Sequence, residues 1–156
     1  MKTQINSIIF ALTLFLTGLY PWNNVQAQTI SYSYAEELPN GYYITTFVET
    51  LDSNARSSTK TATKTCNISS NTGEVVATYK LIASFSYPYN DTARCTSTTY
   101  STSVNDSSWS FSDCSADKSG NKATGHFIIK KTFLGITRDT IEKTITITCD
   151  KNGNIS

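Results

Sequence analysis

Hydrophobic and polar positions alternate with a period of two along most of this chain, which is typical of β-strands that bury one face. The two clearest segments are Glu74–Tyr87 and Thr137–Asp150. The side chains expected on their buried faces are Val75, Ala77, Tyr79, Leu81, Ala83 and Phe85 in the first segment, and Ile141, Ile145, Ile147 and Cys149 in the second. Threonine, serine and charged residues occupy the other face of each segment, so both predict half-buried strands.

Turn-forming residues divide the chain into similar segments. The expected strands are Gly41–Thr50, Ser57–Ser69, Glu74–Tyr87, Thr92–Val104, Trp109–Asp117, Lys122–Gly135 and Thr137–Asp150. No segment after residue 27 places apolar residues at helical spacing. We therefore expect an all-β fold, a two-sheet antiparallel sandwich that is broadly immunoglobulin-like and has about seven strands, with a small barrel as the alternative.

The N-terminus predicts a secretory signal helix. Lys2 precedes an apolar run from Ile8 to Tyr20, which is too short for a comfortable membrane span. Small residues then predict cleavage between Ala27 and Gln28, with an uncleaved anchor helix as the alternative. We expect residues 1–27 to be removed.

The remaining chain would consist of an N-terminal arm with the first strand or strands, 28–56, and a β-sandwich core, 57–156, without a further run of membrane-spanning length. Without Lys2, the basic side chains fall from 13 to 12 and equal the 12 acidic ones. No basic cluster is larger than Lys130–Lys131, whereas binding to nucleic acid or to anionic lipid needs one. The charge pattern therefore predicts no nucleic-acid partner and disfavours a membrane surface. The signal peptide, without a further apolar run, predicts a protein that is released outside the cell.

Four cysteines follow the predicted signal peptide: Cys66, Cys95, Cys114 and Cys149. An even number in a small secreted domain predicts disulfide bonds, each contributing about 2–4 kcal/mol, mainly by constraining the unfolded chain. Their spacing lacks the close pairs of a zinc site, and the single histidine, His126, cannot complete one. Spacing alone leaves three pairings open.

No motif for catalysis or cofactor binding is present. His126 is the one histidine that could activate a nucleophile, and a surface histidine in mid-strand is the simpler interpretation. Asp106, Asp113 and Asp117 could offer oxygen ligands to calcium, but without EF-hand spacing they are interpreted as solvated turn residues. Glu36-Glu37 is interpreted as part of a solvated arm. We expect no catalytic residue, cofactor or metal, and a hydrolase with a site formed only by the fold is the least favoured alternative.

Aromatic residues in polar surroundings are the candidate ligand contacts. Trp109 follows a serine- and aspartate-rich stretch and is interpreted as a core anchor after an Asx-type turn, with an exposed ligand platform as the alternative. Tyr87 and Tyr89 lie in a predicted turn and could contact a ligand together with Trp109. Further tyrosines cluster near the N-terminus: Tyr32, Tyr34, Tyr42 and Tyr43.

Three motifs carry a resemblance to known proteins: SVNDSSW (Ser103–Trp109), KSGNKAT (Lys118–Thr124) and TITCDKNGNIS (Thr146–Ser156). With them, residues 57–156 resemble a group of small secreted β-proteins of Gram-positive bacteria that have no known activity. The resemblance implies secretion, a β-sandwich and the disulfide pairs Cys95–Cys149 and Cys66–Cys114.

The aromatic residues in polar surroundings, in a chain predicted to be secreted, favour a module that binds an extracellular protein or glycan. A secreted antagonistic factor, bacteriocin-like or toxin-like, is the alternative, because small size, neutrality and the absence of an anchor permit it.

Overall fold

The protein is all-β in the part of the chain that its computed structural model describes, residues 28–38, 40–52, 58–87 and 91–156. The predicted signal peptide lies outside these residues, and so does Tyr89. Within them there is no helix, and none of their segments could cross a membrane as a helix.

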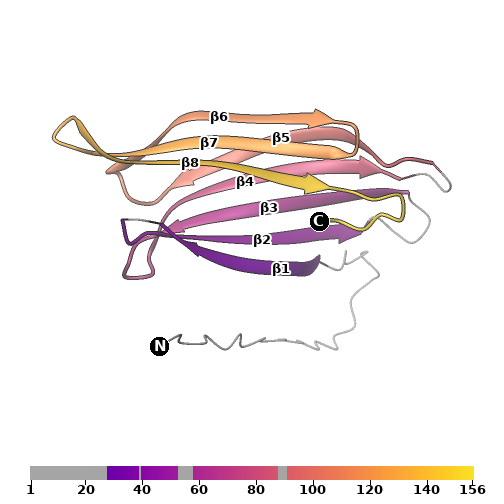
Figure 1. Cartoon of the computed structure of the whole chain (residues 1–156), viewed down its shortest axis with the longest axis horizontal. Helices are drawn as coiled ribbons and strands as arrows, with labels where there is room; N and C mark the ends of the chain where they lie inside the picture. The colour runs from indigo at the N-terminus through magenta and orange to yellow at the C-terminus, as the bar shows by residue number, and fades with distance from the viewer. Residues whose placement is uncertain (1–27, 39, 53–57, 88–90) are drawn as a thin grey trace, which may run out of the picture.

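Eight strands form two antiparallel sheets (Figure 1). The first sheet contains β1 (Gln28–Glu37), β2 (Tyr43–Asp52), β3 (Thr59–Ser69), β4 (Val75–Ser86) and β5 (Arg94–Val104). The second contains β6 (Trp109–Ser119), β7 (Lys122–Phe133) and β8 (Ile136–Thr148). The sheets pack face to face, because apolar side chains of β3, β4, β7 and β8 share one buried cluster.

The strand order follows the chain without a crossover in either sheet. Immunoglobulin domains instead use Greek-key connections between strands that are not neighbours in sequence. The immunoglobulin-like part of the prediction is therefore not confirmed, while the two-sheet, sandwich-like arrangement is. The difference arises because consecutive strands are ladder partners, except β5 and β6, between which the chain passes from one sheet to the other.

The alternating pattern correctly predicted the core. Tyr79, Leu81 and Phe85 of β4 are fully buried, as are Phe127 of β7 and Ile147 of β8. The predicted face of β4 is buried throughout except at its first residue, which is half-buried beside a shift in the β3–β4 register. The predicted turn at 118–121 is also confirmed, with Gly120 at φ 58°, a conformation that glycine adopts without the Cβ penalty.

The edge of β8 that has no ladder partner in its sheet is bound to the first sheet by side chains. The ammonium of Lys64, on β3, donates to the Thr146 carbonyl at 2.8 Å. Lys143 forms an ion pair with Glu36 of β1. The Asn40 amide donates to the Asp139 carboxylate. Glu36 is exposed, as the solvated-arm interpretation expected, but it lies on a sheet strand, and its carboxylate connects β1 to β8.

Candidate functional site

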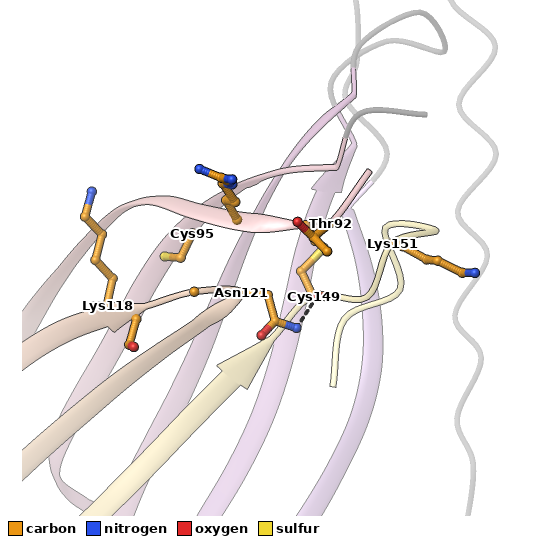
Figure 2. Close-up of a pocket in the computed structure, with 10 residues that line it drawn as sticks. Thr92, Cys95, Lys118, Asn121, Cys149 and Lys151 are labelled. Atoms are coloured by element: carbon orange, nitrogen blue, oxygen red, sulfur yellow. Dashed lines mark hydrogen bonds between the residues drawn. The ribbon is translucent and has the colours of Figure 1, made fainter. Parts of the chain in front are cut away.

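A cleft of about 710 Å³ opens where the start of β5, the β6–β7 turn and the end of β8 meet (Figure 2). Backbone hydrogen bonds fix this junction. The Cys95 amide donates to the Gly120 carbonyl at 2.8 Å, and the Cys149 amide donates to the Asn121 carbonyl at 3.1 Å. The Asn121 side chain returns a bond to the Cys149 carbonyl at 2.7 Å. The two-residue turn thus connects the start of β5 to the end of β8 through hydrogen bonds among residues that line the cleft.

Three cationic side chains line this cleft: Arg94, Lys118 and Lys151. They come from β5, β6 and the segment after β8, and all three are exposed. In the view of Figure 2, Lys118 and Lys151 project on opposite sides, with the two cysteines and Asn121 between them. No carboxylate is among the described residues that line the cleft, so its charge is net positive.

Asp150 stands next to Lys151 in sequence but is engaged within its own turn. Its carboxylate accepts bonds from the Asn152 amide and from the Asn154 amide and side chain, each at 2.8 Å. These bonds favour the charged form and lower the pKa of Asp150 below its usual value. The turn also presses Gly153 against the Tyr87 ring, where an added Cβ would lie 2.6 Å from a ring carbon. Tyr87, a predicted ligand contact, therefore packs half-buried beneath the C-terminal turn.

The four cysteines are free thiols in this structure, so the predicted disulfide bonds are not formed in it. Each of the two cleft cysteines has its own partner: Cys95 Sγ donates to the Ser97 carbonyl at 3.3 Å and Cys149 Sγ to the Asp150 carbonyl at 3.4 Å. Burial is the largest cause that raises the pKa of both thiols. Lys118 lowers the pKa of Cys95, but burial outweighs it, and protonated thiols are poor nucleophiles.

The cysteines of the other predicted pair both lie next to Tyr79. Cys66 is the ladder partner of Tyr79, and its sulfur lies 3.4 Å from Thr46 Oγ1. The Tyr79 hydroxyl donates to the Ser115 carbonyl, next to Cys114, at 2.7 Å. Both are free thiols, and burial raises the pKa of both.

Trp109 is a core residue, as its anchor interpretation predicted. Only 3% of its surface is exposed, and its ring packs edge-on against Tyr42 at a centroid distance of 5.0 Å. The Lys131 ammonium lies 5.9 Å from its ring centre. The Asx-type turn before it is confirmed, since Asp106 Oδ1 accepts from the Ser108 amide at 2.9 Å, which lowers the Asp106 pKa. A buried ring offers no platform, so Trp109 is removed from the candidate ligand contacts.

The remaining candidates lie apart from the cleft. His126 is on the outer face of β7, with Nδ1 3.2 Å from Thr144 Oγ1 and Nε2 3.9 Å from Glu142. Asp113 and Asp117 are exposed on β6 rather than in turns. Among the described residues, no group of three or more histidine, cysteine or acidic side chains could hold a metal ion.

The cationic cleft was missed at the level of sequence. Its cations are separated by 24 and 33 positions, and no local pattern connects them. The clue that does exist is the turn at 118–121, which was identified as a hairpin and not as a junction. Comparison of the chain with protein-family models, with curated proteins and with solved structures found no match.

Proposed function

We propose that this chain is a secreted extracellular binding module and that its cationic cleft binds an anionic group on a glycan or protein. The observation that carries the proposal is that Arg94, Lys118 and Lys151 all line one cleft whose described lining holds no carboxylate. Cations gathered on a concave surface raise the local concentration of anions. The predicted neutral net charge makes this a local feature rather than a general attraction to polyanions.

Binding to acidic ligands should depend on these three cations. The purified mature chain is tested on a glycan array that contains neutral, carboxylated, sulfated and phosphorylated members. Exposed ion pairs contribute up to about 1 kcal/mol each, so Arg94→Gln/Lys118→Gln/Lys151→Gln should weaken binding to acidic glycans roughly tenfold or more. Added salt should weaken the wild type in the same direction.

The control removes charge away from both the cleft and the β7–β8 hairpin, as Lys80→Gln/Lys143→Gln, and should bind acidic glycans as the wild type does. The proposal is contradicted if the cleft variant binds acidic glycans as tightly as the wild type does, or if the wild type binds neutral glycans alone. Killing of bacterial or host cells by the same protein would instead support the antagonistic factor.

Secretion and disulfide formation belong to the same proposal. Protein recovered from the medium should begin at Gln28, and its intact mass should show that each predicted bond has removed two hydrogen atoms. Peptide mapping would identify the pairs. Four free thiols would contradict the disulfide prediction, and a retained N-terminal segment would contradict cleavage.

A further inference from the structure

The tip of the β7–β8 hairpin exposes three large apolar side chains side by side in sequence. Phe133, Leu134 and Ile136 are 59%, 85% and 56% exposed, with Gly135 between the last two. In Figure 1 this hairpin reaches further out than the neighbouring β5–β6 turn. Single exposed apolar residues are ordinary, whereas a contiguous apolar tip on a soluble domain marks a site of interaction.

The backbone conformation at the tip is unfavourable for leucine, which indicates that the Leu134 side chain has a role. Leu134 has φ 51° and Gly135 φ 75°, so both central residues of the turn are in the left-handed region. Two-residue hairpin turns of this kind favour Asn, Asp or Gly at the first position, because a branched side chain is strained there. Among the described residues, Leu134 is the one non-glycine residue with positive φ. Strain kept at an exposed residue points to function.

Two cationic residues flank the base of the tip. Lys130 precedes it on β7 and Arg138 follows it on β8, while the four tip residues and the two threonines beside them are uncharged. The Lys131 ammonium is turned inward instead and donates to the Tyr42 hydroxyl. The nearest acid, Asp139, accepts a hydrogen bond from Asn40. The sequence contains no long run of cations, but the hairpin places cations from two strands below one apolar tip.

We propose that this hairpin tip inserts into the surface of a lipid bilayer that contains anionic headgroups. An apolar projection with a basic base matches the two layers of such a surface, where acyl chains lie beneath negative headgroups. The tip is convex and one turn wide, which suits a fluid surface better than the broad flat patch of a stable protein interface. This surface is separate from the cleft, because the cleft lies at the opposite ends of β7 and β8.

The test is co-sedimentation of the mature chain with phosphatidylcholine vesicles, with and without phosphatidylglycerol. The wild type should bind the anionic vesicles at least about tenfold more tightly than the neutral ones. Leu134→Asn should reduce that binding about tenfold or more. Because asparagine is favoured in left-handed turns, this variant should also unfold at the same temperature as the wild type or higher, which excludes misfolding as the cause.

Two further variants complete the experiment. Lys130→Gln/Arg138→Gln should lower binding to anionic vesicles toward the level on neutral ones. Leu51→Thr, at an exposed apolar residue near the end of β2 that is far from the tip, should bind as the wild type does. The proposal is overturned if anionic vesicles are not bound, if neutral vesicles are bound equally, or if Leu134→Asn binds like the wild type. Self-association that Leu134→Asn abolishes, without vesicle binding, would assign the tip to a second copy instead.

Discussion

Replacing Trp109 by alanine should cost about 3–5 kcal/mol of unfolding free energy, the range for removing a large aromatic side chain from a core. The indole fills the space between the two sheets near the β5–β6 corner, and its removal also ends the edge-on contact with Tyr42. Urea unfolding followed by circular dichroism measures the loss as a lower transition midpoint.

Two control variants test whether the loss comes from the buried ring rather than from the indole N–H or from removing any aromatic side chain. Trp109→Phe should lose much less unfolding free energy than Trp109→Ala. The indole Nε1 is buried without a protein hydrogen-bond partner, so its removal breaks no hydrogen bond. Tyr100→Ala, at a ring that is 42% exposed, should also lose less than Trp109→Ala. A Trp109→Ala protein as stable as the wild type would mean that the ring is not a core anchor. For the same reason, loss of binding in Trp109→Ala would report unfolding and not a ligand contact.

Gly125→Ala should destabilise the protein by about 1–3 kcal/mol through overpacking. A Cβ at residue 125 would lie 2.5 Å from the Tyr79 hydroxyl oxygen, 3.1 Å from a Tyr79 ring carbon and 3.2 Å from a methyl carbon of Leu81. The ring cannot easily retreat, since its hydroxyl is bonded to the Ser115 carbonyl and its face stacks on Phe127 at 4.8 Å.

A double-mutant cycle with Tyr79→Phe tests this contact. Tyr79→Phe alone should cost about 1 kcal/mol for the lost hydrogen bond. In the double variant the closest clash is gone, so the combined loss should be smaller than the sum of the two single losses, by about 0.5 kcal/mol or more. Additive losses measured by urea unfolding would show that the hydroxyl does not limit the space at residue 125.

Local patterns predicted the parts of this fold that depend on local physics. The burial of Tyr79 and Phe85 follows from period-two alternation, and the 118–121 turn follows from glycine chemistry. The sheet assignment was out of reach, because alternation tells which face of a strand is buried and not which strand it meets. Strand β1 was expected only as part of an arm, because its many polar residues give no clear alternation. In the structure it pairs with β2, and the ion pair between Glu36 and Lys143 also connects it to β8.

The candidate sites show the same limit. The sequence does not group the three cleft cations, because they come together only where three strand ends meet in the fold; they are Arg94, Lys118 and Lys151. The tip around Gly135 was predicted as a turn, but its exposure depends on how far β7 and β8 extend beyond the rest of the sheets. The cysteine count predicted disulfide bonds from the presumed compartment, while the positions of the thiols depend on long-range pairing.

The lysine bound to the free side of β8 has a consequence for how copies of this protein meet. An exposed strand edge invites a strand from another molecule, which would extend the sheet and begin an aggregate. At Thr146 the carbonyl that such a strand would need is already occupied by the Lys64 ammonium, which is 9% exposed. An incoming strand would have to expel that ammonium and would gain only one neutral hydrogen bond in its place. The side chain that bonds β3 to β8 therefore also opposes the addition of a strand at this point of the edge.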